Sequence, residues 1–535
     1  MLYKSMTCET QIETENVAPI EKIIDSFLIK EKVYQSEISI LKEQIRYLQG
    51  QLFGRKSEKI SSDDGQLSLF ETSEQGFPIV EQPEDDDIEI PGHTRKKRGR
   101  KAIPEDLPRI DVIHDVDETE KHCECGCEKT CIGQEISEQL DIIPATIQVI
   151  RNVRLKYACK NCEGVESDGP TVTIARMPEQ LIPKSIGTPG LIAFVIAAKF
   201  IDALPFYRQE KQFLRIGVKL SRATMCNWAQ KIAQSCEILL MMLKEEILSG
   251  PLINIDETPV QVLKEPGKTS QSKSYMWIFR GGTQEHPGIL FEYHPTRSGD
   301  VPAEFLKDYK GVVQTDGYSG YEFLDHILVI LHMGCWAHLR RKFLDVVKAA
   351  GKPKDGKSKS GNADQAMKYI RKLYKIEKDA KKLGLVNEDL LRERQEKAKP
   401  ILEEFKRWLD TKSEQTPPKG LLGKAIGYAL NQWHRLVIYA DTYHVTMDNN
   451  MAENTIRPFV IGRKNWLFSG TPAGAAASAA IYSLIETAKA NGLEPYWYLR
   501  YLFENLPEAM TKDDYRALLP QYLNKSQLAG PANIS

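Results

Sequence analysis

A short stretch near residue 450 gathers residue types that together could hold a metal ion against a phosphate backbone. Glu453 supplies a carboxylate, and Arg457, Arg463 and Lys464 follow it within eleven residues. Trp466 comes next. Cations neutralise phosphates and flat aromatic side chains stack on bases, so this pattern predicts that Glu453 binds metal and that the cations and Trp466 contact nucleic acid.

The same glutamate has a second, purely structural interpretation. Asn450 could be the N-cap of a helix and Glu453 its N3 residue, forming a capping box that only satisfies backbone N–H groups. Pro458 should bend or end that helix just past Arg457, which would turn the GRKNW segment outwards. Carboxylates arriving from elsewhere in the chain would favour the metal-binding interpretation.

Two aspartates lie where strands would deliver them to such a site. The apolar segment Leu252–Val262 predicts a strand with Asp256 in its middle. A charge in the centre of an apolar strand is costly to bury unless it binds something. Asp316 ends a further expected strand, Gly311–Asp316, although Asp316 and Gly317 could simply form a turn.

The elements around these aspartates follow a recognisable order. Strands are expected at Tyr275–Arg280 and Gly288–Tyr293, a short helix at Ala303–Tyr309, and a further buried strand at Ile327–Met333. Three strands, a helix and a strand are the opening of a ribonuclease-H-like sheet, in which one Asp lies on the first strand and one at the end of the fourth.

Cys335 and His338 form a C-x-x-H pair directly after the last of these strands. The pair could bind metal, but no second pair lies close by in the sequence. We therefore expect a packing or hydrogen-bonding role beside the site. Arg340, Arg341 and Lys342 follow on the same helix and could face DNA.

A separate metal site is predicted from cysteine spacing. Six of the ten cysteines fall between residues 123 and 162, and clustering of this kind without an export signal favours metal over disulfides. We expect four thiolates to hold a structural zinc ion in a small zinc ribbon: Cys123, Cys125, Cys159 and Cys162. In the first cluster, Cys127 or His122 could replace one of them.

Three further segments point to DNA or to self-association. A basic arm, in which six of seven residues are cationic, predicts contact with a DNA backbone or minor groove, or is a solvated charge run: Arg95, Lys96, Lys97, Arg98, Arg100 and Lys101. Phe213–Trp228 is typical of a helix-turn-helix, with its second helix capped by Ser221 and Arg222 on the candidate recognition helix. Helical hairpins outside DNA-binding proteins share this pattern.

Residues 20–60 are expected to form one long helix with a heptad stripe of apolar residues: Tyr34, Ile38, Leu41, Ile45, Leu48 and Leu52. The stripe indicates a coiled coil that joins copies of the chain, or a helix packed on its own domain. The N-terminus lacks a signal-peptide pattern, and no apolar run approaches the ~20 residues that span a bilayer. We expect a cytoplasmic, nucleoid-associated protein that does not engage the membrane.

Four motifs in order identify a resemblance: NIDETPV, QTDGYSGY, GCWAHLRRKF and AENTIRPFVIGRKNWLFSGT. They resemble transposases of the insertion sequence sixty-six family over nearly the whole chain. The resemblance implies a DDE-type catalytic domain with Asp256, Asp316 and Glu453 as its acids. It also implies small accessory proteins of the same element as partners. Many relatives carry C-x-x-C where this chain has Cys123-Glu-Cys-Gly-Cys127.

The expected fold class is a multidomain α/β protein with a ribonuclease-H-like catalytic domain. The expected divisions are 1–60 coiled-coil helix, 61–108 disordered acidic then basic linker, 109–180 zinc ribbon, 181–247 helical region, 248–344 and 447–510 the two parts of the catalytic domain, 345–446 helical insertion and 511–535 a loosely held tail.

The expected function is Mg²⁺- or Mn²⁺-dependent DNA transposition. The chain would bind terminal inverted repeats and target DNA, and the three acids would hold two metal ions. Water would cut at the end of the element, and the freed 3′-OH would then attack the target. Two other classes stay open: a nuclease that hydrolyses without joining, and a DNA-binding protein without catalysis.

Overall fold

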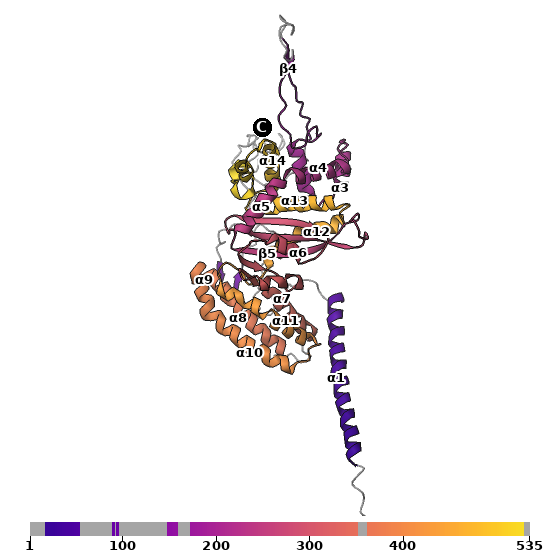
Figure 1. The fold of residues 1–535 in the computed structure, drawn as a ribbon, viewed down its shortest axis with the longest axis vertical. Coiled ribbons are helices and arrows are strands. Elements are labelled where there is room, and N and C mark those ends of the chain that lie inside the picture. Colours follow the sequence, from indigo (N-terminus) through magenta and orange to yellow (C-terminus); the bar gives the residue numbers. More distant parts are fainter. Residues whose placement is uncertain are drawn as a thin grey trace, which may run out of the picture. The chain divides into compact units, whose positions relative to one another are not determined.

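The computed structural model describes residues 17–53, 88–90, 93–95, 147–158, 172–350 and 361–528. The chain forms two compact units, of which one combines Met1–Phe77 with Glu179–Ser535 and the other is Pro78–Pro178. The first unit contains Asp256, Asp316 and Glu453 and most of the regular structure (Figure 1).

A five-stranded mixed sheet organises the first unit. Its strands in chain order are β5 (Leu252–Gln261), β6 (Lys273–Gly282), β7 (Pro287–His294), β8 (Gly311–Gln314) and β9 (Ile330–Met333). Their order in space is β7-β6-β5-β8-β9. β5 runs antiparallel to β6 and parallel to β8, while β7 is antiparallel to β6 and β9 parallel to β8. The strand that carries Asp256 is therefore the central one.

The predictions for the first three strands are confirmed, whereas the later elements are shifted. The fourth strand ends at Gln314, two residues before Asp316. The short helix α6 (Asp300–Phe305) begins earlier than expected. The fifth strand begins at Ile330 because a turn precedes it, and Leu328 in that turn is 100% exposed. The predicted burial of this segment is thus wrong before Ile330.

Helices cover both faces of the sheet. On one face Phe279 of β6 stacks on Phe305 of α6, with ring centroids 3.6 Å apart. On the other, Phe291 of β7 packs against Phe459 of α12 (Asn450–Trp466). Both aromatic contacts lie in one continuous apolar core. Burial of these rings, at roughly 25 cal/mol per Å² of apolar surface, fixes α6 and α12 on opposite faces.

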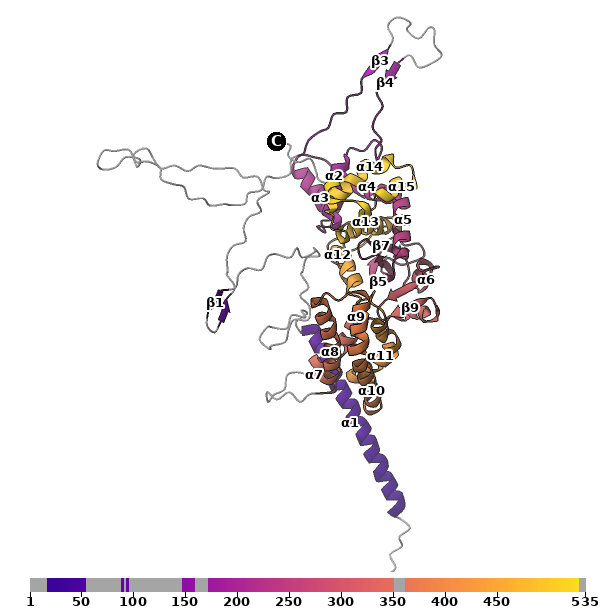
Figure 2. The ribbon, with the colours of Figure 1, turned by 90° about the vertical axis from the view of Figure 1, so that its left-hand side faces the viewer.

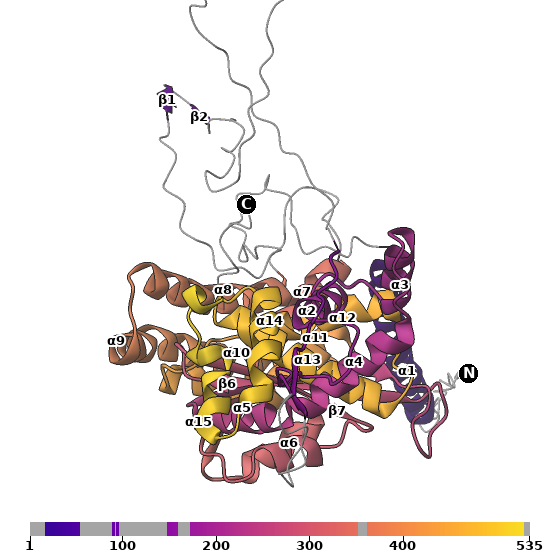
Figure 3. The same ribbon diagram turned by 90° about the horizontal axis from the view of Figure 1, so that it is seen from above.

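The outer edge of β7 is covered by α13 (Pro472–Ala490), as Figure 3 shows from above. The Ser483 hydroxyl accepts the N–H of Phe291 at 2.8 Å, and the Thr487 hydroxyl accepts the N–H of Ile289 at 3.0 Å. These side chains satisfy backbone groups that an edge strand would otherwise offer to another chain. This alanine-rich helix ends at Asn491 and Gly492, where Gly492 has a φ of +71°.

The helical region before the sheet has the predicted helix–turn–helix shape. It comprises α2 (Pro189–Phe200), α3 (Phe206–Arg215), α4 (Arg222–Ser235) and α5 (Glu237–Ser249). Gly217, at a φ of +83°, makes the turn between α3 and α4. The Ser221 side chain accepts the N–H of Thr224 at 3.2 Å, so the predicted cap is confirmed.

A helical group separates β9 from α12 in the sequence and builds its own core. It consists of α7 (Trp336–Ala350), α8 (Asn362–Lys382), α9 (Asn387–Glu393), α10 (Lys399–Gln415) and α11 (Leu421–Leu436). Phe405 is central to this core and contacts the rings of Tyr369 and Trp433. Figure 2 shows α8, α10 and α11 gathered together, with the sheet between them and α13.

Arg394 joins this helical group to the segment that leads into α12. Its guanidinium is almost fully buried and forms two hydrogen bonds with the Glu377 carboxylate, at 2.8 and 2.6 Å. It also donates to the carbonyls of Tyr439, Thr442 and Val445. Because a buried cation without partners is strongly destabilising, these contacts hold the irregular 437–445 segment in one conformation.

The C-terminal residues pack better than the sequence suggested. The aromatic-rich helix α14 (Pro495–Asn505) is followed by α15 (Lys512–Ala517). Leu519, Leu523 and Leu528 are buried in the main core. The prediction of a loosely held tail is therefore wrong for the described residues to 528, because apolar residues spaced along short turns were not recognised as core positions.

At the other end of the chain, the predicted long helix is confirmed as α1 (Val17–Phe53). None of the described helices is long and apolar enough to cross a membrane.

The second unit contains two short hairpins among its described residues. One pairs β1 (Ile88–Ile90) with β2 (His93–Arg95), inside the expected linker, and the other pairs β3 (Lys156–Ala158) with β4 (Val172–Ile174). The four cysteines predicted to bind zinc and the basic arm beyond Arg95 lie outside the described residues.

Candidate functional site

Asp256 lies in the middle of β5 on the face covered by α12. It pairs across strands with Ile278, which in turn pairs with Phe291, so these three side chains share one face. Burial, together with the charges of Glu257, Asp316 and Glu453, raises the pKa of Asp256 to about 8. The backbone N–H of Glu257 donates to Asp256 Oδ1 at 2.8 Å and partly opposes this shift. A carboxyl group whose pKa is raised this far by burial and neighbouring charges is typical of a functional site.

The register of two parallel strands places Asp316 beside Asp256. Asn254 of β5 pairs with Gln314 of β8, and each aspartate follows two residues later. The backbone N–H of Tyr318 donates to Asp316 Oδ1 at 2.9 Å, which orients the carboxylate in the turn after the strand. The sequence left open whether Asp316 is a site residue or simply part of a turn. In the structure it is a turn residue that also neighbours Asp256.

Glu453 lies in the first turn of α12, and Asn449 fixes where that helix begins. The Asn449 side chain donates to the carbonyl of Ile255 at 2.9 Å and accepts from the Asn254 side chain at 2.9 Å. Both partners directly precede Asp256 on the strand. The start of α12 is thereby attached to β5 beside the buried aspartate.

The predicted capping box is not formed. The helix does begin at Asn450, but the N-cap residue is Asn449, and its side chain makes no capping hydrogen bond because it is committed to β5. Glu453 instead faces α7, with its Oε1 3.7 Å from His338 Nδ1 and its Oε2 3.6 Å from Arg341 Nη2.

A buried amide network behind these acids was missed by the sequence analysis. Gln314 accepts from Asn254 at 2.8 Å and donates to the carbonyl of Thr446 at 2.9 Å, which ties the segment before α12 to β8. Asn254 and Gln314 are polar residues inside apolar strands. A polar residue inside an apolar strand is the same pattern that indicated Asp256, and it would have indicated Asn254 and Gln314 as well.

A second missed cluster lies on the opposite face of β5. Glu257 pairs with Trp277 across strands, forms an ion pair with Arg297 and accepts a hydrogen bond from the Tyr321 hydroxyl. The Arg297 guanidinium lies 3.6 Å from the centroid of the Tyr318 ring. This cluster holds the turn after Asp316 against β5.

The cations after Glu453 lie on one uninterrupted helix. α12 runs through Pro458 to Trp466, so of the two expected effects of Pro458, a bend or an end, the end just past Arg457 is wrong. A proline inside a helix costs about 3 kcal/mol, but burial of residues on both sides of it, including Phe459, opposes that cost. Residues four and seven positions apart share a helix face, so Glu453, Arg457 and Lys464 point the same way.

The structure separates these predicted nucleic-acid contacts by environment. Arg457 and Lys464 are exposed, as is Arg222 at the start of α4. Arg463 is half-buried and donates to the Thr258 hydroxyl at 3.3 Å. Trp466 is half-buried and packs its ring against Phe459, with centroids 5.5 Å apart, so it lies at the edge of the core in this conformation.

The three acids do not form a compact ligand set. Among the described residues, one group of at least three potential metal ligands has all its ligand atoms within 4.8 Å of one another, and it is Cys335, His338 and Glu453. The hydrogen-bonding role expected for Cys335 is confirmed, because its Sγ accepts the N–H of Asn449 at 3.2 Å.

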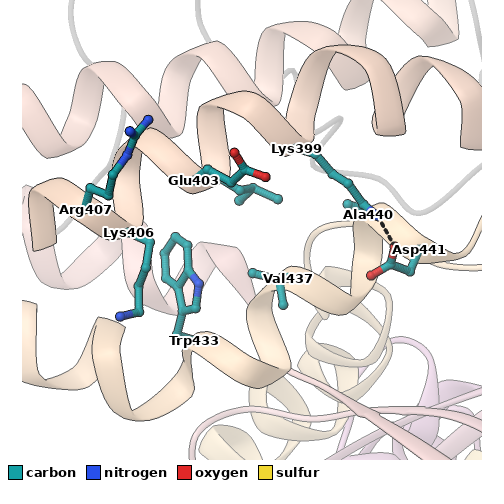
Figure 4. Close-up of a pocket in the computed structure, with 9 residues that line it drawn as sticks. Lys399, Glu403, Lys406, Arg407, Trp433, Val437, Ala440 and Asp441 are labelled. Atoms are coloured by element: carbon teal, nitrogen blue, oxygen red, sulfur yellow. Dashed lines mark ion pairs between the residues drawn. The ribbon is translucent and has the colours of Figure 1, made fainter. Parts of the chain in front are cut away.

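A separate hollow of about 540 Å³ lies within the helical group between α10 and α11 (Figure 4). Lys399 spans its rim through an ion pair with Asp441 at 2.8 Å. Trp433 and Glu403 line it, but none of the acids discussed above does. The hollow therefore lies apart from the candidate site.

Comparison with known proteins agrees with this architecture. The Transposase IS66 family model matches residues 184–477, and the zinc-finger binding domain of transposase IS66 matches residues 120–163. The IS66 C-terminal element matches 483–521, and a model described as Transposase C of IS166 homeodomain matches 40–112.

Two relatives from Sinorhizobium fredii (strain NBRC 101917 / NGR234) extend this likeness along the chain. Uncharacterized protein y4qI is 30% identical over 92% of this chain and 90% of its own length. Uncharacterized protein y4jD is 30% identical over 90% of this chain and 94% of its own length. The chain belongs to the Transposase IS66 family, and the resemblance identified from its motifs is confirmed. Family membership supports a transposase of an insertion sequence, and the zinc-finger match supports a structural zinc ion.

The pKa of Asp256 leads to a prediction about stability. Its folded pKa of about 8 lies above the ordinary 3.8, so between these values the folded state holds a proton that the unfolded state has lost. The stability of the metal-free protein should therefore fall as pH rises through this window. This fall in the free energy of unfolding should be on the order of 1–3 kcal/mol, and Asp256→Asn should abolish it.

Thermal unfolding in the presence of a chelator, at pH 5 and at pH 8, measures this difference. The exposed Asp513 provides the control, and Asp513→Asn should behave as the wild type does. Equal pH dependence in Asp256→Asn and wild type would show that this carboxyl is not destabilised by burial.

Proposed function

We propose that this chain cuts and joins DNA as a DDE-type transposase, with Asp256, Asp316 and Glu453 as its three acids. The main support is the β5–β8 register together with the Asn449 attachment, which bring together an acid on the central strand, an acid in the turn after its parallel neighbour and an acid in the first turn of α12. The strand order β7-β6-β5-β8-β9, with the first three strands antiparallel and the last two parallel to β5, supports a ribonuclease-H-like domain.

The chemistry of the three acids fits a divalent cation such as Mg²⁺ or Mn²⁺, although in the metal-free chain their ligand atoms are not gathered into a compact set. Burial disfavours the charged form of Asp256, and the two neighbouring acids add repulsion. A cation reverses both effects. Mg²⁺ takes few protein carboxylates, together with water and substrate phosphates, so three acids suffice. When bound, the metal would activate the attacking oxygen and stabilise the leaving one.

The protein's own residues then have distinct tasks. Asp256 and Asp316 are oriented by backbone N–H groups, and Asn449 sets the position of Glu453. In the proposed reaction water cuts at the end of the element, and the freed 3′-OH attacks target DNA. No covalent protein–DNA intermediate is required, so no serine or tyrosine nucleophile is assigned.

We propose that exposed cations hold the DNA. Arg457 and Lys464 extend the Glu453 face of α12 and would neutralise phosphates next to the cut, with half-buried Arg463 beside them. Arg222 on α4 and the basic arm from Arg95 to Lys101 would bind the terminal repeats. Stacking of Trp466 on a base would require its ring to leave Phe459.

We further propose that the domain divisions expected from the sequence hold, and that the element's accessory proteins are partners. The helical insertion 345–446 then lies within one catalytic domain, whose two parts are 248–344 and 447–510.

Replacement of a single acid tests the catalytic proposal. Asp256→Asn, Asp316→Asn or Glu453→Gln should each lower Mg²⁺-dependent cleavage of terminal-repeat DNA at least about a hundredfold, because charge stabilisation in the transition state is lost. Binding of the same DNA should persist. Glu304→Gln, an exposed acid on α6, is the matched control and should cleave normally.

The same assay separates the alternatives. Cleavage without end joining would indicate a nuclease, and DNA binding with neither reaction in the wild type would indicate a binding protein. End joining by Glu453→Gln would show that Glu453 has been wrongly assigned.

The α12 cations give a prediction about salt. Each phosphate contact contributes about −0.9 to the slope of log K against log salt. The double variant Arg457→Ala, Lys464→Ala should therefore bind DNA more weakly at all sequences, with a slope reduced by roughly 2. Lys382→Ala, an exposed cation of α8, should leave the slope unchanged. An unchanged slope in the double variant would place the DNA elsewhere.

We propose that α1 joins copies of the chain as a coiled coil. Its apolar stripe is largely exposed in the single chain, from 45 to 61%: Tyr34, Ile38, Leu41, Ile45 and Leu48. Leu41→Lys should shift the molar mass measured by light scattering from an oligomer towards the monomer, whereas Lys42→Ala should not. A wild-type chain that is monomeric at micromolar concentration would contradict this proposal.

A further inference from the structure

Glu453 has neighbours that a magnesium ligand does not need. Cys335 lies directly before α7, and His338 lies in the first turn of that helix. Their Sγ and ring nitrogen atoms, with a Glu453 oxygen, all lie within 4.8 Å of one another. The sequence analysis set the C-x-x-H pair aside because no further ligand was close in the chain. α12 supplies that ligand.

We propose that Cys335, His338 and Glu453 form a site for a transition-metal ion of the zinc type, and that this site shares Glu453 with the catalytic acids. The inference rests on the proposed function of Glu453 and adds a form of regulation to it. An ion held at this site would withdraw Glu453 from Asp256 and Asp316, and would inhibit Mg²⁺-dependent cleavage.

The ligand chemistry selects the class of metal. Thiolate and imidazole are soft ligands that favour Zn²⁺ or Co²⁺, whereas Mg²⁺ prefers oxygen ligands and water. Cysteine, histidine and glutamate all bind zinc, and three protein ligands leave a fourth position for water. The site is thus chemically distinct from a three-carboxylate magnesium site, although the two have Glu453 in common.

The distances are close to those of a tetrahedral site. Zinc bonds of about 2.0–2.3 Å place tetrahedral ligand atoms roughly 3.3–3.8 Å apart. His338 Nδ1 and Glu453 Oε1 are 3.7 Å apart, and the widest separation in the group is within 4.8 Å. Rotations about side-chain bonds that move a ligand atom by about 1 Å would bring all three ligand atoms to tetrahedral separations without any movement of the helices.

Two of the three ligand atoms also lack another partner. His338 Nδ1 and Glu453 Oε1 are buried, and neither has a hydrogen-bond partner. Their 3.7 Å separation is too long for a hydrogen bond. A buried polar atom without a partner costs about 1–3 kcal/mol, and one metal ion would satisfy both.

Cys335 is prepared for a metal rather than for free reactivity. It is 1% exposed and is therefore shielded from reagents in the solvent. The backbone N–H of Asn449 points at its sulfur at 3.2 Å and would stabilise a metal-bound thiolate. On binding, the S–H bond would break, the sulfur would ligate the metal and the proton would pass to water.

The metal content of the full-length protein tests the site directly. After equilibration with Zn²⁺ and removal of free ion, the wild type should hold one more zinc per chain than Cys335→Ser or His338→Asn, in addition to any zinc-finger metal common to all. Cys236→Ser removes a buried thiol outside the cluster and should match the wild type. With Co²⁺, the wild type should show extra thiolate-to-cobalt absorption that Cys335→Ser lacks.

Inhibition provides the second measurement. Zn²⁺ added to the Mg²⁺ reaction should inhibit wild-type cleavage, and Cys335→Ser should require at least about tenfold more zinc for the same fractional loss of its own activity. Equal zinc content in wild type, Cys335→Ser and His338→Asn would overturn the inferred site and leave Cys335 as a hydrogen-bond acceptor only. An extra zinc in a wild type that never cleaves DNA would instead refute the proposed catalysis and leave the site in place.

Discussion

The attachment of Asn449 to β5 is the contact on which the candidate site depends. Asp256 lies on β5, and Asp316 lies in the turn after the neighbouring strand β8. Glu453, in contrast, comes from a helix that follows a large helical group in the sequence. Two hydrogen bonds from one side chain fix the start of that helix to backbone and side-chain groups beside Asp256. At the other end of α12, Ser469 bonds to Gln261 and Leu263 at the end of β5. The helix is thus held along the strand at both ends.

The helical group contributes to the site by holding the chain that enters α12. Arg394 binds three carbonyls of the 437–445 segment, and Gln314 binds the carbonyl of Thr446 a residue later. Asn449 follows directly. A rearrangement in the packing of α8, α10 and α11 would therefore reach Glu453 through contiguous hydrogen bonds, whereas Asp256 is placed by the central strand of the sheet.

Sequence reasoning found the parts of the site that local pattern specifies. A charge inside an apolar strand indicated Asp256, and a strand followed by a turn indicated Asp316. The Asn254–Asn449 contact joins residues 195 positions apart, and no local pattern specifies such a pair. Pro458 led to a wrong prediction, because proline by itself tends to end a helix. Burial of Phe459 and its neighbours instead keeps α12 continuous through this residue. Tertiary packing decided both outcomes.

The continuity of α12 determines which residues share a helix face with Glu453. Because the helix is unbroken, Glu453 shares a face with Arg457 and Lys464, and this face would meet the DNA. Yet in the single chain the same carboxylate faces α7, towards His338 and Arg341, and its Oε1 has no hydrogen-bond partner. The start of α12 therefore fixes where Glu453 lies, and in the proposed functions a bound metal ion would decide whether this carboxylate joins Asp256 and Asp316 or Cys335 and His338.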